Sequence, residues 1–394
     1  MKLFERGELR LLWPFYLEGF ITLVLFFAPV FYVIYFKQIG LSLFQAGLVW
    51  AMAPLFSLLT DIPTGAIADL YGRKFSVLVG NLLQAICLLL VYFTTDFYAL
   101  LVIFALLGVA STFVSGAYEA WTTELVRKHD KKLLHPFFTK KMSIDSAGLL
   151  LGGLVGATVV KVLGIRVIWL VAAAAFFAGF VILLFAKEQF TPKRAHVGEA
   201  VRQFHTQMHR SLSFSFRHHV IVHFLAASIL LGIGSSFLTW TPFLQGFGIP
   251  DHVFGYIWSG FGLLGIIGPL VASRFYKKGK ERPLIIVAII CMALASLAVI
   301  AIYNAMLAVA ALLTLVFFES AKRPTERVYF HRFIPNKMRA TIGSVESMLI
   351  SLAVAISLPI IGIAVDVFGP RNIIFASGIL MLVALGLYLR IKER

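Results

Sequence analysis

The 394-residue sequence has little charge: 14% of its residues are Asp, Glu, Lys or Arg, and only 19 are acidic. Soluble domains carry about a quarter charged residues, which argues against a soluble enzyme. Its two cysteines, Cys87 and Cys291, both lie in apolar runs, which excludes a disulfide scaffold and a Cys-rich metal site. Walker A, HExxH and nucleophile-elbow sequences are absent. We therefore expect no use of ATP as an energy source, no enzyme activity and no cofactor.

Apolar residues are abundant instead. They make up 60% of the chain, and the mean hydropathy is +0.90. Because a transmembrane helix needs about 20 apolar residues, the pattern predicts an all-α integral membrane protein with twelve transmembrane helices. We place them at residues 11–36, 43–67, 75–95, 97–123, 139–161, 165–186, 219–246, 252–275, 283–303, 305–328, 338–364 and 370–390.

The formal net charge of +16 is compatible with a nucleic-acid partner, but its distribution indicates a membrane orientation instead. Of 35 Lys and Arg residues, one set of alternate connections carries only Lys37, Lys161, Arg166 and Arg371. Basic residues favour cytoplasmic loops. We therefore predict a multi-pass protein of the plasma (inner) membrane with both termini in the cytoplasm, no cleavable signal and no nucleic-acid partner.

A long polar connection divides the predicted spans into two sets of six. The predicted parts are an N-terminal six-helix bundle (1–186), a cytoplasmic linker (187–218) and a C-terminal six-helix bundle (219–394). A six-plus-six arrangement with a cavity between the halves is typical of repeat-built transporters. His205 and His209 are spaced as metal ligands on a helix. No acidic or Cys ligand accompanies them, so a solvated linker without a metal is expected.

The strongest motif is Gly-Ala-Ile-Ala-Asp-Leu-Tyr-Gly-Arg-Lys at residues 65–74, which we call the signature loop. It resembles the signature of the major facilitator superfamily, in which this loop acts as a cytoplasmic gate latch. The resemblance implies that role for Gly65, Asp69, Gly72 and Arg73, and for Glu124 as the partner of Arg73. Gly65 permits close helix approach, and Asp69 suits the N-terminus of a neighbouring helix. The alternative is an ordinary basic loop with a turn at Gly72.

Two further glycine motifs bear on this resemblance. The predicted fifth span contains Gly148, Gly152, Gly153 and Gly156. It resembles the glycine-rich motif of proton-exchanging exporters of the family but lacks their proline, and small residues also suit plain helix packing. Both interpretations stay open. The segment 268–274, the counterpart of the signature loop in the second half, lacks the acidic residue, so a second latch is not expected.

Charged residues inside spans are costly and usually face a cavity or a partner. The resemblance implies that spans one, four, seven and ten line the transport cavity, which makes Glu18, Glu119 and Glu319 the candidates for proton or substrate binding. Glu18 has no basic neighbour in its own helix. Glu319 shares a helix face with Lys322 and Arg323, so it is either a proton carrier or one partner of a static ion pair.

Other acidic residues inside the spans are Asp61, Asp145 and Glu346. For Asp61 and Asp145, near the cytoplasmic boundary, we expect pairing with Lys140, Lys141 or loop bases. Aromatic side chains are a second class of cavity candidate, although aromatics at helical spacing more often serve packing. They are Tyr16, Tyr32, Tyr118 and Trp240, with Gln245 as an added polar candidate.

These features predict a monomeric secondary transporter that works by alternating access in the lipid bilayer. The leading hypothesis is proton-coupled efflux of small apolar or cationic molecules, since the cavity candidates are acidic and aromatic. The alternative is proton-coupled uptake of an anionic nutrient, with Lys322 and Arg323 as the anion site. Outside transport, a lipid-handling protein or a polytopic membrane enzyme remains open.

Overall fold

The computed structural model describes residues 8–188, 218–234, 236–277, 279–334 and 339–391. These residues form helices and contain no strand. The helices are α1 (Glu8–Leu25), α2 (Ala28–Gln38), α3 (Leu43–Tyr71), α4 (Arg73–Phe93), α5 (Phe97–His129), η1 (Lys131–Leu133), α6 (Leu134–Leu163), α7 (Val167–Leu184), α9 (His219–Gly234), α10 (Phe237–Gln245), α11 (Val253–Phe275), α12 (Glu281–Leu297), η2 (Ala298–Ala301), α13 (Ala305–Arg332), α14 (Arg339–Phe368) and α15 (Pro370–Arg390).

Twelve helical segments in this described part are long and apolar enough to cross a membrane, which confirms the predicted all-α architecture. The clearest differences are in length. Helix α5 runs to His129, although the predicted span ends at residue 123, and α6 begins at Leu134 rather than at 139. Hydropathy detects only the apolar part of a helix, whereas backbone hydrogen bonding continues through the polar turns beyond it.

Polar caps and glycine turns set where several spans begin. Asp96 accepts a hydrogen bond from the backbone N–H of Ala99 at 2.8 Å and so caps the start of α5. Asn304 does the same for α13 through the N–H of Met306, also at 2.8 Å. The turn before α4 is made by Gly72, whose φ of 106° is unfavourable for residues with a side chain. At these three helix starts a local signal ends the connection.

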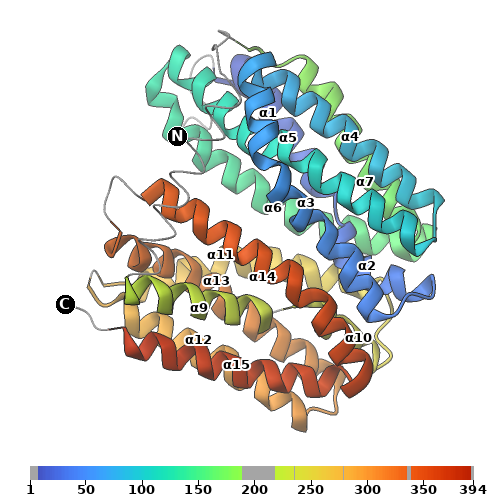
Figure 1. Cartoon of the computed structure of the whole chain (residues 1–394), viewed down its shortest axis with the longest axis vertical. Helices are drawn as coiled ribbons and strands as arrows, with labels where there is room; N and C mark the ends of the chain where they lie inside the picture. Colours follow the sequence, from blue (N-terminus) through green and yellow to red (C-terminus); the bar gives the residue numbers. More distant parts are fainter. Residues whose placement is uncertain (1–7, 189–217, 235, 278, 335–338, 392–394) are drawn as a thin grey trace. The chain divides into compact units, whose positions relative to one another are not determined.

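The contacts divide the chain into two compact units. Unit 1 comprises Met1–Tyr35, Met52–Arg202 and Asp251–Ser259. In unit 1, α4 packs on α5 and α7, while α1 packs on α6 and α7 (Figure 1). A buried apolar cluster that includes Phe15, Trp121 and Phe137 joins α1, α5 and α6. This packing fixes the positions of the polar side chains that α1 and α5 carry.

Unit 2 comprises Phe36–Ala51, Gln203–Pro250 and Gly260–Arg394. Helix α12 packs on α13 and α15, and α15 packs in turn on α9 (Figure 1). Phe224 of α9 stacks on Phe330 of α13, with ring centroids 4.2 Å apart. Helix α12 therefore packs on both α13 and α15, and a hydrogen bond from Tyr388 of α15 reaches Glu326 of α13.

The glycines of α6 lie at close helix contacts within unit 1. Gly148, Gly152 and Gly156 face the α1–α2 segment, and a Cβ built on them would lie 2.8, 2.7 and 2.8 Å from its atoms. Gly153 faces α11, where a Cβ would overlap Ser259. Small residues that let backbones approach are how membrane helices associate. This supports helix packing as the role of these glycines. A role of the motif in export stays a prediction.

Two spans are interrupted part-way along. The helix that begins at Glu8 breaks at Phe26 and Phe27 before α2 continues it, and in the span that begins at His219 the backbone is extended at Ser236, directly before α10. Ser236 caps α10, its hydroxyl accepting from the N–H of Leu238. Discontinuous helices in corresponding positions of two halves mark binding sites in transporters. Both breaks lie in the first span of a predicted half.

Candidate functional site

Glu18 is a buried carboxylate on α1 in unit 1, with 8% of its surface exposed. The phenol of Tyr118 on α5 donates to Glu18 Oε2 at 2.8 Å, and the Thr22 hydroxyl donates to Oε1 at 3.4 Å. No Lys or Arg of the described chain lies within ion-pairing distance of it. Glu18 and Tyr118, two residues selected from the sequence, are thus brought together where aromatic side chains of α1 and α5 meet.

A separate ion pair lies beside this carboxylate. Lys141 Nζ is 2.9 Å from Asp145 Oδ2, one turn apart on α6, as the sequence predicts for Asp145. A Cβ built on Gly19 would lie 3.3 Å from Asp145 and 3.5 Å from Lys141, so this glycine leaves room for the pair beside α1. Because Asp145 compensates Lys141, the charge of Glu18 is left to hydroxyl donors.

Asn81 of α4 is a neighbour that the sequence analysis missed. Its side chain is 2% exposed, and its amide nitrogen has no hydrogen-bond partner among the described residues. A Cβ built on Gly179 would lie 3.3 Å from that nitrogen and 3.4 Å from Cγ of Glu18. A polar residue in the middle of an apolar span was the available signal. Together with Glu18, Thr22 and Tyr118 it makes a small polar site inside unit 1.

The remaining cavity candidates of unit 1 lie apart from this site. Tyr16 is buried, and its hydroxyl donates to Glu8 at 2.7 Å, a carboxylate that also pairs with Lys140. Tyr32 is buried. Glu119 follows Tyr118 on α5 but is exposed. The structure therefore groups Tyr118 with Glu18 and places Tyr16 beside Glu8, and the cavity role of Tyr16 stays a prediction.

Unit 2 contains the charged cluster of α13. Lys322 is 3% exposed and pairs with two carboxylates, Glu319 at 3.6 Å and Glu326 one turn later. Arg323 also pairs with Glu319, at 3.1 Å, but is 74% exposed. Tyr388 of α15 donates to Glu326. The predicted ion pairs of Glu319 are present. The structure therefore supports the interpretation of Glu319 as a partner in static ion pairs.

Glu326 is the member of this cluster that sequence reasoning did not single out. It falls in the last turns of the predicted tenth span, four residues after Lys322. That spacing places the two residues on one helix face, and it was the signal that could have found the pair. Elsewhere in unit 2, Trp240 is 1% exposed and packs with its ring 5.9 Å from Phe243, while Gln245 accepts from Lys37 at 3.2 Å.

The signature loop contains the predicted ion pair. Arg73 lies 2.7 Å from Glu124 of α5 and also donates to the carbonyl of Ala120 at 2.9 Å. Lys128 adds a second cation, 3.0 Å from Glu124. Arg73 thereby fastens the start of α4 to the last turns of α5. The role of this contact as a gate latch stays a prediction.

Two details of the signature loop differ from expectation. A Cβ built on Gly65 would meet no atom of the described chain within 4 Å, so the expected close helix approach is not there, because Gly65 lies on an exposed face of α3. Asp69 is likewise exposed, and no hydrogen bond of it occurs in the described ranges. The N-terminus of α4 is capped instead by Glu188, which accepts from the N–H of Lys74 at 2.9 Å.

The remaining polar candidates from the sequence are Asp61, Glu346 and the linker histidines. Asp61 is exposed, and no basic partner for it is found among the residues that the structure describes. Glu346 lies on α14 and is partly buried. Most of the linker, including His205 and His209, lies outside the described residues. In the described part no group of His, Cys, Asp or Glu is arranged to hold a metal ion.

Comparison with known proteins identifies the class. The profile of the Major Facilitator Superfamily matches residues 15–358, so the chain belongs to this family. Multidrug resistance protein MdtG of Enterobacter lignolyticus (strain SCF1) is 32% identical over 177 residues, 43% of this chain and 40% of that protein. The uncharacterized MFS-type transporter YxaM of Bacillus subtilis (strain 168) is 20% identical over 369 residues, 92% of this chain and 90% of that one.

Among solved structures, the nucleoside transporter NupG has the same fold, with a TM-score of 0.79 at 12% identity over 96% of this chain and 99% of that one. The matched segment spans about two fifths of the length of the MdtG relatives. The family and the twelve apolar helices of the described part identify a multi-pass membrane protein of the Major Facilitator Superfamily.

Proposed function

We propose that the protein is a proton-coupled secondary transporter that exports small apolar or cationic molecules by alternating access, as a monomer in the bacterial inner membrane. In this proposal both termini and the linker are cytoplasmic, and the halves 1–186 and 219–394 are the moving bodies. The similarity to MdtG supports efflux, and the family membership supports transport driven by a gradient.

The observation that carries the proposal is the burial of Glu18 without a basic partner among the described residues. It is nearly inaccessible to water, it has hydroxyl donors, and the nearby lysine is already paired with Asp145. An ionised carboxylate held away from water without a counter-ion is costly, so binding of a proton or of a cationic substrate relieves that cost. A group that binds its proton in one state and releases it in another couples the gradient to the conformational change.

The break in the first span supports the same location. Glu18 and Thr22 lie on α1 shortly before the interruption at Phe26 and Phe27, and interrupted helices carry the binding sites of several transporter folds. Glu119 and Glu319 are further candidates on the fourth and tenth spans. We assign them a secondary role, because Glu119 is exposed and Glu319 is paired with two cations.

The test is transport by Glu18→Gln in proteoliposomes, with a panel of cationic dyes, sugars and organic anions, with and without a pH gradient. Glutamine imitates the protonated acid, so transport driven by the pH gradient should fall at least about tenfold while substrate binding and exchange persist. Asp96→Asn is the matched control. It removes a carboxylate but retains a side chain that caps α5, and it should transport normally. Full pH-driven transport by Glu18→Gln would disprove the assignment.

The alternative is uptake of an anionic nutrient at Lys322 and Arg323. Arg323 is exposed and offers free donors, but the ammonium of Lys322 lies between Glu319 and Glu326. An anion would have to compete with both carboxylates, so this function is less well supported. Counterflow of organic anions that is lost in Arg323→Gln and retained in Glu18→Gln would favour uptake over efflux.

A further inference from the structure

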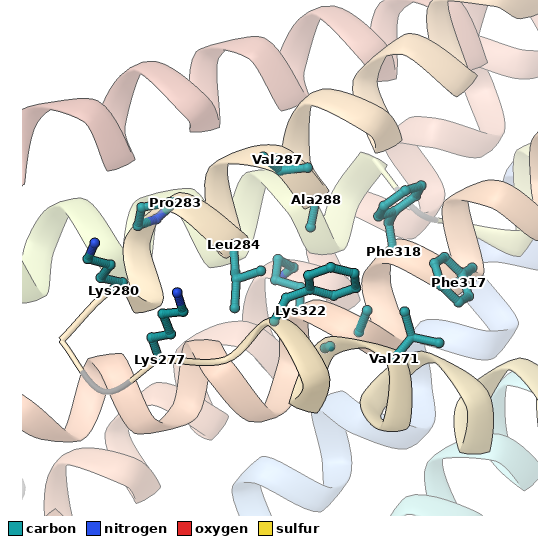
Figure 2. Close-up of a pocket in the computed structure, with 13 residues that line it drawn as sticks. Val271, Lys277, Lys280, Pro283, Leu284, Val287, Ala288, Phe317, Phe318 and Lys322 are labelled. Carbon is teal, nitrogen blue, oxygen red and sulfur yellow. The ribbon is translucent and has the colours of Figure 1, made fainter.

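A pocket of about 460 Å³ lies in unit 2 where α11, α12 and α13 meet (Figure 2). This volume falls within the range of about 300–1,000 Å³ that ligand sites occupy. Its walls are mostly apolar. The side chains that matter for its shape are Val271, Phe275, Leu284, Val287, Phe317 and Phe318.

The pocket opens on the surface of the spans. Phe275 is 66% exposed and Val287 is 54% exposed, and both line the pocket. Large apolar side chains exposed on a transmembrane helix are the ones that meet lipid. The opening is therefore suited to an apolar chain that enters from the bilayer.

The two ends of the pocket differ in polarity. Lys277 and Lys280 lie at one end, and Phe317 and Phe318 lie at the other (Figure 2). Both lysines belong to the connection between α11 and α12, which is the level of the lipid headgroups. Val287 is six residues into α12, about 9 Å deeper. Neither lysine has an ion pair with any residue the structure describes, so both ammonium groups are available.

Glu281 binds two described residues beside these lysines, Tyr276 and Gly279. This carboxylate is 1% exposed and accepts from the N–H of Gly279 at 3.1 Å and from the hydroxyl of Tyr276 at 3.0 Å. That hydrogen bond raises the pKa of the Tyr276 phenol, which stays neutral. Arg332 lies 2.6 Å from Glu281 and neutralises it. Glu281 therefore leaves little uncompensated negative charge at this end of the pocket, where Lys277 and Lys280 lie.

We propose that this pocket binds one anionic phospholipid, with an acyl chain between α11, α12 and α13 and the phosphate at Lys277 and Lys280. On the orientation proposed above the lipid belongs to the cytoplasmic leaflet. Basic pockets between transmembrane helices on that side recognise anionic headgroups. A zwitterionic lipid would fill the apolar end and gain less from the lysines, and an apolar substrate would not use them at all. The site is independent of Glu18 and of the direction of transport.

The test of the headgroup is native mass spectrometry of the full-length protein in detergent, titrated with dioleoylphosphatidylglycerol or dioleoylphosphatidylcholine. The wild type should retain one phosphatidylglycerol in preference to phosphatidylcholine. At about fivefold per lysine, the double variant Lys277→Gln, Lys280→Gln should bind phosphatidylglycerol about 25-fold more weakly. The Arg pair at the same positions should restore binding. The control is Lys131→Gln, Lys132→Gln, which removes the same charge from exposed residues of η1 and should bind like the wild type.

The test of the apolar end uses Val287→Trp, which fills the pocket from an exposed position. It should weaken both lipids, whereas Leu294→Trp, two turns further along α12 and 59% exposed, should weaken neither. Equal retention of the two lipids by the wild type, or unchanged phosphatidylglycerol binding in the glutamine pair, would overturn the proposal. Displacement of the lipid by millimolar inorganic phosphate would show a phosphate site rather than a lipid site and would overturn it too.

Discussion

Glu18 and Glu326 are both carboxylates within helices, and they differ in how their charge is compensated. Glu18 accepts from two hydroxyl groups, while Glu326 accepts from the ammonium of Lys322 and from the phenol of Tyr388. The first can change its protonation without breaking an ion pair. The second cannot, because loss of its charge would leave Lys322 buried with Glu319 alone at 3.6 Å. This difference separates a candidate proton site from a structural one.

Glu326→Gln should therefore destabilise the protein without acting as a transport variant. Loss of a partly buried hydrogen bond to a charged group costs about 1.5–3 kcal/mol, and the melting temperature in detergent should fall accordingly. Arg323→Gln is the contrast, since Arg323 is 74% exposed and exposed pairs contribute about 0–1 kcal/mol. Equal losses in the two variants would show that burial of Lys322 does not determine the stability of this cluster.

The sequence predicts helices well and their polar partners poorly. Twelve apolar runs predict twelve spans, because the local hydropathy of a segment determines whether it can span the hydrocarbon core of the bilayer. Pairs on one helix, such as Lys141 with Asp145, follow from the helical repeat. Tyr118 is 100 residues from Glu18, and Glu188 is 114 residues from Lys74. Such partners depend on which helices pack together, which a single sequence does not specify.

The start of α4 offers a test of the signature loop. Arg73→Ala removes the contacts to Glu124 and to the carbonyl of Ala120, so closure on the cytoplasmic side should weaken because a charge-assisted hydrogen bond is lost. Transport should fall severalfold while the amount of protein in the membrane stays the same. Asp69→Asn should act in the same direction if the loop is a latch.

Lys128→Ala is the control for this pair. It also removes a cation from Glu124, at 3.0 Å, but this pair lies within one helix, α5, one turn apart. Transport should be close to that of the wild type. If Arg73→Ala and Asp69→Asn both transport normally, the loop is a turn centred on Gly72, whose φ of 106° already accounts for a glycine there.

Over the whole chain, the depth of each residue and the side on which the signature loop lies depend on which way the spans run. The fold is the same in either orientation, so helix positions do not decide it. We propose cytoplasmic termini from the distribution of basic residues, because Lys37, Lys161, Arg166 and Arg371 are the only Lys or Arg in the connections assigned to the outside. Burial also matters for a test, since the native Cys87 is 5% exposed and reacts poorly with bulky polar reagents.

Single cysteines placed in a cysteine-free background should report this orientation. Gln203→Cys, in the linker outside the described residues, should react with a membrane-impermeant maleimide only after cells are opened. Thr95→Cys, at an exposed position between α4 and α5, should react in intact cells, since an odd number of spans separates it from the cytoplasmic N-terminus. The paired design checks both sides at once, because reagent access to one site predicts exclusion from the other. Labelling of Gln203→Cys in intact cells would reverse the orientation, and with it the assignment of the lysine pocket to the cytoplasmic leaflet.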